Sequence, residues 1–266
     1  MVAIFSVEAV VSRSVPLVGW SGSFLAKVIK SWFPREVLEC GFSISPLLMG
    51  RRIVLSGVNG SSTVLEAGSR VAFRFTSYCR DGSTTSRVVD VLSSGALDVF
   101  RVAGVEFQVL ESSMDLVRGC SWCGGDRLVK YIDSRGRGVV EVFFGPTMLM
   151  FRGWRVLYPS PQRLIYTLAR SGVNFFEIDP RVAKKRARTL SRNVEVIGFG
   201  TRSVDVSIGR DRVVKAFMGR ALFGVQGLEN LRDFVELLEV GRAVGAGRSR
   251  GIGFGYMEYR VAEPGV

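Results

Sequence analysis

The sequence predicts an α+β protein built of two tandem ferredoxin-like (RRM-like) domains, each with the order βαββαβ. Segments with the alternating apolar and polar pattern of a strand are interleaved with amphipathic segments of helical period. The same succession of segments occurs twice along the 266 residues. Loop-forming residues around 118–126 separate the two copies, so we divide the chain into residues 1–122 and 123–266.

The first copy begins with a strand in MVAIFSVEAVV. Ser21 and Ser23 are candidate N-caps of a helix through FLAKVIKSWF, which Pro34 ends. Strands follow in GFSISPLLM and SRVAFRFTSY, separated by a loop rich in Gly, Ser and Asn. STTSRVVDVLSSG is predicted to be a helix that ends at Gly95, and ALDVFRVAGVEFQVLES a pair of strands.

The second copy follows the same plan. RGVVEVFFGPTMLMF is predicted to be a pair of strands and PSPQRLIYTLARSG a helix. NVEVIGFG and TRSVDVSIG are two further strands, GLENLRDFVELLEVG is the second helix, and FGYMEYRV is the last strand. A glycine-rich loop over residues 243–255 joins this helix to this strand.

A separate stretch, DPRVAKKRARTLSR, is predicted to be a basic helix. Asp179 is a suitable N-cap and Pro180 occupies the first helical position. The spacing i, i+3, i+4, i+7 and i+11 puts five cations on one side: Arg181, Lys184, Lys185, Arg188 and Arg192. No acidic residue accompanies them at helical spacing, so we expect phosphate contact; the alternative is a solvated basic surface.

The overall charge points in the same direction. Lys and Arg number 36 against 24 Asp and Glu, a formal net charge of +12, which favours nucleic acid as the partner. The chain has no apolar run of the about eighteen residues that a transmembrane helix needs. Its N-terminus lacks the pattern of a signal peptide, so we expect a cytoplasmic protein with no membrane partner.

The cysteines give only a weak indication of a metal site. The chain has no histidine and four cysteines: Cys40, Cys79, Cys120 and Cys123. A zinc site around the CxxC pair would need the thiolates of all four cysteines. A disulfide is an alternative if the source is a hyperthermophile. We interpret them as ordinary buried or turn cysteines and expect no metal and no cofactor.

The segment AVGAGRSRGIGFGYMEYR combines five glycines with two arginines. Its GAGRSRG spacing is one residue longer than a dinucleotide fingerprint. A helix precedes it and a strand follows it, the reverse of the order that a nucleotide-binding βα turn requires. The context therefore excludes a nucleotide site.

Several segments together resemble one family, the CRISPR-associated endoribonuclease that processes repeat RNA, the sixth Cas family of the RAMP superfamily. FSISPLL resembles its aromatic-x-x-Ser-Pro-Leu strand and RVAFRFTSY its next strand. FFGPTMLMFRGWRVLYPSPQRLIYTLARSGVNF resembles its strand, Tyr-Pro-x-Pro and helix segment, and VGRAVGAGRSRGIGFGYMEY its glycine-rich loop. The order and spacing of these segments extend the resemblance over nearly the whole chain.

The resemblance implies binding of CRISPR repeat RNA and its metal-independent cleavage. The 2′-hydroxyl attacks its own phosphate and leaves a 2′,3′-cyclic phosphate and a 5′-hydroxyl. Glycines bring a backbone close to another chain, and their exposed N–H groups form an anion nest. In the glycine-rich loop we expect RNA contacts from Gly245, Gly247, Arg248 and Arg250, and packing roles for Gly253 and Gly255.

The chain departs from the family pattern at the cutting residue. Members commonly use a histidine between the first helix and the Ser-Pro strand, but PREVLECGFSIS contains none. Some archaeal relatives are thought to use lysine, arginine or tyrosine instead. We therefore assign proton transfer to Lys27 and Lys30 and phosphate contacts to Arg51 and Arg52. Solvated lysines on a helix surface are the alternative.

Two other functions stay open: a protein that binds repeat RNA without cutting it, and a RAMP subunit of a CRISPR effector complex. A homodimer is compatible with the sequence. Trp20, Trp122 and Trp154 are candidate platforms for unpaired bases, and each also fits packing in a core or at a domain boundary.

Overall fold

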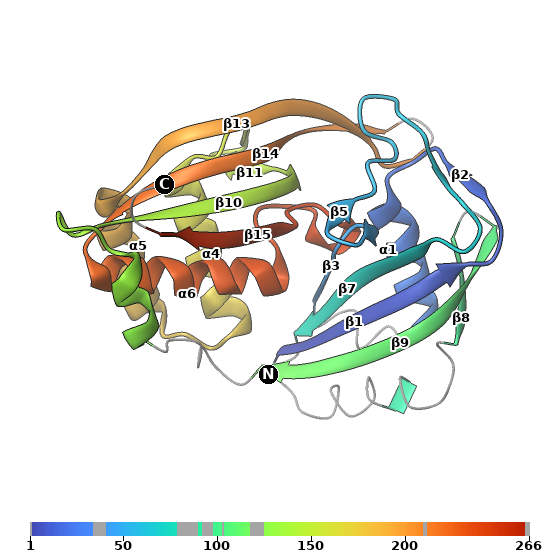
Figure 1. The fold of residues 1–266 in the computed structure, drawn as a ribbon, viewed down its shortest axis with the longest axis horizontal. Coiled ribbons are helices and arrows are strands. Elements are labelled where there is room, and N and C mark those ends of the chain that lie inside the picture. Colours follow the sequence, from blue (N-terminus) through green and yellow to red (C-terminus); the bar gives the residue numbers. More distant parts are fainter. Residues whose placement is uncertain are drawn as a thin grey trace. The chain divides into compact units, whose positions relative to one another are not determined.

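The structure, a computed structural model, describes residues 2–33, 41–78, 90–91, 98–102, 104–117, 125–209 and 212–263. The chain forms two compact units (Figure 1), each with a hydrophobic core of its own. The first unit comprises residues 1–117, 204–215 and 249–254, and the second comprises residues 118–203, 216–248 and 255–266. The boundary expected between residues 122 and 123 lies outside the described residues.

An antiparallel sheet with the strand order β5-β4-β7-β1-β9-β8 forms the first unit, and β3 also pairs with β7. The order β9-β1-β7-β3 at its centre is that of a ferredoxin-like sheet. Two short strands, β2 (Val15–Leu17) and β6 (Thr63–Leu65), pair separately. The strands of the main sheet are β1 (Val2–Val11), β3 (Phe42–Ile44), β4 (Leu48–Met49), β5 (Arg52–Ile53), β7 (Arg70–Tyr78), β8 (Val99–Val102) and β9 (Val105–Val117).

Aromatic rings fill the core of the first unit. Phe5 on β1 is the register partner of Phe75 on β7, with ring centroids 5.7 Å apart, and Phe33 stacks on Phe75 at 5.0 Å. Helix α1 (Ser21–Trp32) contributes its buried apolar side to the same core. The alternation of buried and partly exposed residues along β1 explains why the sequence pattern identified this strand.

The start of α1 differs from the prediction. Neither Ser21 nor Ser23 caps the helix, because the N-cap residue is Trp20 and no side chain supplies the capping hydrogen bond. The hydroxyl of Ser21 is buried and instead accepts a hydrogen bond from the backbone N–H of Leu47 at 3.1 Å. Of the helix predicted over STTSRVVDVLSSG, the structure describes only residues 90–91, which are helical; the remainder lies outside the described residues.

The second unit has the complete ferredoxin-like plan. Its sheet has the strand order β13-β14-β10-β15, and the core between the sheet and the helices contains residues from both. The strands are β10 (Arg137–Thr147), β13 (Val194–Ser207), β14 (Val213–Gln226) and β15 (Met257–Ala262). The helices are α4 (Pro161–Phe175), α5 (Pro180–Asn193) and α6 (Leu228–Val244), after the 3-10 helix η1 (Gly125–Tyr131). The predicted α+β class with two ferredoxin-like units is confirmed.

Two strand predictions in the second unit were wrong. The segments NVEVIGFG and TRSVDVSIG form one strand, β13, and its partner β14 was not predicted. A Cβ on Gly219 of β14 would lie 2.9 Å from the Cα of Thr201 and would collide with the carbonyl oxygen of Gly200. The glycines here therefore allow two strands to approach closely and do not form a turn.

The strand pairing predicted for RGVVEVFFGPTMLMF also differs from the pairing in the structure. Its two strands, β10 and β11 (Leu149–Phe151), do not pair with each other. β10 pairs with β14 and β15, whereas β11 forms a hairpin with β12 (Trp154–Val156).

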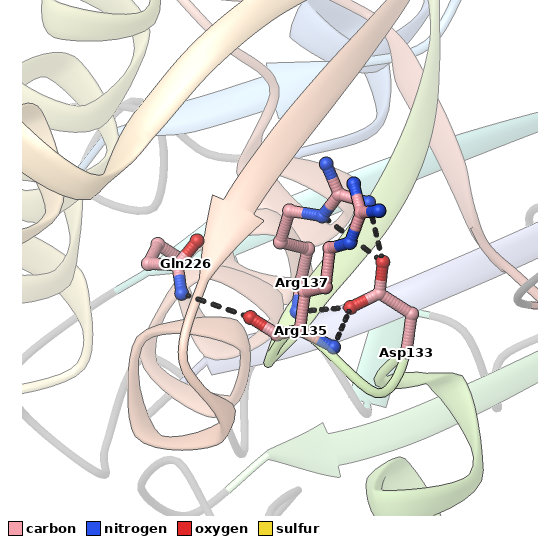
Figure 2. A network of polar contacts seen from close by, with 4 residues as sticks. All are labelled: Asp133, Arg135, Arg137 and Gln226. Carbon is pink, nitrogen blue, oxygen red and sulfur yellow. Dashed lines mark hydrogen bonds and ion pairs between the residues drawn. The ribbon is translucent and has the colours of Figure 1, made fainter.

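A polar network fixes the turn that leads into β10 (Figure 2). Asp133 accepts hydrogen bonds from the backbone N–H groups of Arg135 and Arg137, both at 2.9 Å, and from the Arg137 guanidinium at 3.0 Å. These bonds, chiefly that from the Arg137 backbone, hold the pKa of Asp133 below its ordinary value. The side-chain amide of Gln226 donates to the carbonyl oxygen of Arg135 at 3.3 Å, so the network also secures the end of β14.

Candidate nucleic-acid interface

The predicted basic helix is α5, and its sequence signals act as expected. Asp179 is the N-cap, and its carboxylate accepts hydrogen bonds from the backbone N–H groups of Arg181 at 2.7 Å and Val182 at 3.0 Å. Pro180 occupies the first helical position. Ala183, Ala187 and Leu190 are buried in the core of the second unit, which turns the opposite side of the helix outward.

That outward side is the basic face of α5. All five of its side chains are exposed: Arg181, Lys184, Lys185, Arg188 and Arg192. Among the residues that the structure describes, none of these five side chains forms an ion pair or a hydrogen bond. Like charges at helical spacing repel one another, so an anion bound on this face would stabilise the helix.

Another arginine of the same helix shows the opposite arrangement. Arg186 lies off the basic face and pairs with Asp233 at 3.6 Å and with Glu236 at 2.9 Å, both on α6. Arg186 therefore fixes α5 against α6. The basic face takes no part in this internal contact.

The four residues assigned to catalysis lie in the first unit, on two elements. Lys27 and Lys30 are exposed on α1, one turn apart, and Arg51 and Arg52 are exposed at the tip of the β4–β5 hairpin. The Ser21–Leu47 hydrogen bond brings the N-terminus of α1 beside the segment that leads into β4. Within the described ranges, none of the four side chains makes a hydrogen bond or an ion pair, with each other or with another residue.

The glycine-rich segment is held by close backbone contacts. Gly245 is the C-cap of α6, with φ 76°, and Gly247 has φ 87°. A Cβ on Gly247 would collide with the carbonyl oxygen of Met148, which accepts a hydrogen bond from the N–H of Arg248 at 3.0 Å. Gly253 and Gly255 are buried with positive φ, as their assigned packing role requires.

Within the first unit, residues 249–254 pack on the start of α1. Trp20 is fully buried, and its indole N–H donates to the carbonyl oxygen of Ile252 at 2.6 Å. A Cβ on Gly22 would lie 2.8 Å from the Cα of Gly253, so no side chain fits between the two backbones. Arg248 before this segment is exposed, and Arg250 within it is half-buried.

The other candidate residues divide into three groups. Trp20 belongs to the core, so the structure supports packing, the second of its two expected roles. Trp122 and all four cysteines lie outside the described residues. Trp154, in contrast, is 78% exposed. Within the described ranges no group of three potential metal ligands occurs. None of the helices there is long and apolar enough to cross a membrane.

Trp154, one of the candidate platforms named from the sequence, lies on the β11–β12 hairpin, whose other exposed side chains sequence reasoning missed. Trp154 pairs across the hairpin with Phe151, and the guanidinium of Arg163 on α4 lies 3.8 Å from the centre of the Phe151 ring. The signal was present in FRGWR, where two aromatic residues flank an Arg-Gly turn. The strand pattern alone does not tell which of these rings is buried.

Comparison with known proteins agrees with this geometry. Residues 142–257 match the family CRISPR-associated endoribonuclease Cas6. This part of the chain is similar to Cas6 endoribonucleases. The resemblance identified from the sequence is therefore confirmed. A comparison with curated proteins finds no match.

Solved Cas6 structures share the fold over nearly the whole chain. A Cas6 product complex is 18% identical, with a TM-score of 0.63 over 97% of this chain and 99% of the other. A Thermus thermophilus Cas6 product complex is 15% identical, with a TM-score of 0.65 over 98% and 100%. The product of a Cas6-related gene from Pyrococcus furiosus is 11% identical, with a TM-score of 0.55 over 98% and 99%.

The close approach of Gly22 to Gly253 predicts a stability effect. Gly22→Ala should lower the free energy of unfolding by about 1–3 kcal/mol, because the added methyl group overpacks the contact. Gly209→Ala is the control, since its Cβ would meet nothing within 4 Å, and its stability should not fall. Urea denaturation measures both. Equal stability of Gly22→Ala and the wild type would contradict the close contact.

The two kinds of cation on α5 predict different effects on stability. Replacement of Lys184, Lys185 and Arg188 together by alanine should change the free energy of unfolding by less than about 0.5 kcal/mol, because these side chains have no partner among the residues that the structure describes. Arg186→Ala should cost up to about 1 kcal/mol, because it removes partly exposed ion pairs to α6. Thermal unfolding checks both variants; a larger loss in the triple variant would show that the basic face has a structural role.

Proposed function

We propose that this protein binds CRISPR repeat RNA and cleaves it through attack of a ribose 2′-hydroxyl on the adjacent phosphate. The observation that carries the proposal is the basic face of α5, five exposed cations without a partner in the described part of the chain. The Cas6 family match over residues 142–257 supports an endoribonuclease. Structural relatives in product and substrate-mimic complexes support RNA as the ligand.

The reaction needs only proton transfers and charge stabilisation. The 2′-oxygen bonds to phosphorus and loses its proton, the bond from phosphorus to the 5′-oxygen breaks, and the 5′-oxygen gains a proton. The products are a 2′,3′-cyclic phosphate and a 5′-hydroxyl, with no water consumed. Negative charge builds up on the phosphorane, so fixed cations close to it lower the barrier.

The exposed cations of the first unit supply groups suited to these steps. One of Lys27 and Lys30 accepts the proton of the 2′-hydroxyl on its neutral amine, and the other donates a proton from its ammonium group to the leaving 5′-oxygen. Arg51 and Arg52 hold the phosphate oxygens, because a planar guanidinium makes two parallel hydrogen bonds to a phosphate. All four side chains are exposed and therefore accessible to RNA.

Other cations hold the rest of the RNA. The basic face of α5 contacts successive phosphates, which requires positive charge but no particular base. Arg248 and Arg250 contact phosphates beside the glycine-rich segment. Gly245 and Gly247 let the backbone there adopt positive φ. Because the N–H of Gly245 is bonded to the carbonyl oxygen of Gly241 and that of Arg248 to Met148, the phosphate contacts fall to the arginine side chains.

A second function, binding without cleavage, has one observation in its favour. The chain contains no histidine, the side chain best suited to both proton transfers near pH 7. A RAMP subunit that holds the RNA within a CRISPR effector complex would use the same phosphate contacts. Cleavage activity separates these two roles from the endoribonuclease.

The decisive experiment is incubation of the purified protein with end-labelled repeat RNA in EDTA. We expect a single cut, with a 2′,3′-cyclic phosphate on the upstream fragment and a 5′-hydroxyl on the downstream fragment. A repeat with a 2′-deoxyribose at the cut position is the control and should stay intact because it has no nucleophile. Intact natural repeat in a stable complex would favour the binder, and cleavage of the deoxy control would contradict the mechanism.

The phosphate contacts of α5 predict an effect on salt dependence. The variant with Lys184→Ala, Lys185→Ala and Arg188→Ala should bind all RNA sequences more weakly by a similar factor. It should also reduce the slope of log affinity against log salt concentration by about 2 to 3, because fewer counterions are released. Filter binding at several salt concentrations measures the slope. An unchanged slope would show that this face does not contact RNA.

The assignment of the lysines predicts a separation of rate from affinity. Lys27→Ala or Lys30→Ala should slow single-turnover cleavage by about a hundredfold or more, with little loss of RNA affinity, if the group acts in proton transfer. Arg51→Ala and Arg52→Ala should reduce both, because phosphate contacts exist before and during the reaction. Cleavage at the wild-type rate by both lysine variants would overturn this assignment.

A further inference from the structure

The β11–β12 hairpin is a rigid support with an exposed tip. Arg152 and Gly153 form its two-residue turn with φ 46° and 88°, the positive values that a tight hairpin turn requires. Leu149 at its base is fully buried in the core of the second unit. Register partners in an antiparallel pair share a face, so the Phe151–Trp154 pair continues the face that Leu149 and Val156 begin.

Two large aromatic rings remain exposed at this tip. Trp154 is 78% exposed, and its register partner Phe151 is 39% exposed. An indole ring that is exposed to water does not gain the free energy that burial of its apolar surface would release. Clustered exposed aromatics on a soluble protein therefore indicate a binding surface.

Arginines surround these rings. Arg163 stacks on Phe151 at 3.8 Å, and Arg152 lies 5.4 Å from the centre of the same ring. No carboxylate in the described part of the chain pairs with either arginine. Positive charge thus lies beside an exposed apolar surface, which we call the hairpin platform: Phe151, Arg152, Trp154 and Arg163.

The chemistry of the hairpin platform suits an unpaired nucleotide. A base stacks on an exposed indole ring while its phosphates contact neighbouring arginines, and this recognition tolerates any base because every base has a π face. A base inside a double helix is already stacked on its neighbours and offers no free face. The basic face of α5 lacks aromatic rings and contacts only phosphates, so the two surfaces have different requirements.

We propose that the hairpin platform binds a single-stranded segment of the RNA, with one unpaired base stacked on Trp154. The inference rests on the proposed function, since it takes RNA as the ligand. It adds a second requirement to that function: unpaired nucleotides on the platform in addition to phosphates on α5. The affinity of the protein for RNA of any sequence would then have two contributions, one from charge on α5 and one from base stacking on the hairpin platform.

The test compares Trp154→Ala, Trp154→Phe and the wild type on a single-stranded oligoribonucleotide and on a blunt RNA duplex. Trp154→Ala should weaken single-strand binding by about 5- to 150-fold, the range found for the loss of one base–aromatic stack. Trp154→Phe should recover most of that loss, and duplex affinity should stay unchanged. Fluorescence titration adds a direct readout, because stacking should quench the wild-type emission and Trp154→Phe should lose most of this quenching.

Phe199→Ala is the matched control, since Phe199 is a second aromatic residue of the second unit and is 61% exposed. An equal loss of single-strand affinity in Phe199→Ala would overturn the assignment to the hairpin. An equal loss of duplex affinity in Trp154→Ala would also overturn it. If Trp154→Ala binds RNA as the wild type does but loses self-association, measured by light scattering, the platform is a protein contact instead. Wild-type protein that binds neither RNA would instead refute the proposed function.

Discussion

The glycine-rich segment depends on a backbone contact that leaves no room for a side chain. In the first unit Gly22 and Gly253 meet backbone to backbone, and the buried indole of Trp20 donates to the carbonyl oxygen of Ile252 beside them. Positive φ at Gly253 and Gly255 is required for the chain to follow this path. The freedom that these glycines confer on the unfolded chain is thus used to hold residues 249–254, with Arg250 among them, against α1 within the first unit.

The cations of the second unit fall into two classes, and the difference between them underlies the functional argument. Arg220 and Arg260 pair with Glu141, whose side chain is almost fully buried, and Arg186 pairs with acidic residues of α6. These arginines hold elements of the fold together. The basic face of α5 and the arginines of the hairpin platform have no carboxylate partner in the described residues. Their charge is available to an external polyanion.

Sequence patterns predicted what is local and periodic. The stripe of cations on α5, its cap at Asp179 and the apolar alternation of β1 follow from spacings within one element. Sequence patterns failed where the structure of a segment depends on a residue far away in the sequence. NVEVIGFG and TRSVDVSIG were predicted as two strands but form one strand that pairs with β14, and the hydroxyl of Ser21 bonds to Leu47, 26 positions away. Exposure of Trp154 likewise depends on α4 and the core and could not be deduced from FRGWR.

The central claim is that the exposed cations on the basic face of α5 hold RNA phosphates. A crystal structure of the protein with a repeat RNA that carries a 2′-deoxyribose at the cut position tests it most directly. The account predicts phosphate oxygens within about 3 Å of the guanidinium and ammonium groups on the basic face of α5. RNA bound elsewhere on the protein, with this face open to solvent, would contradict it.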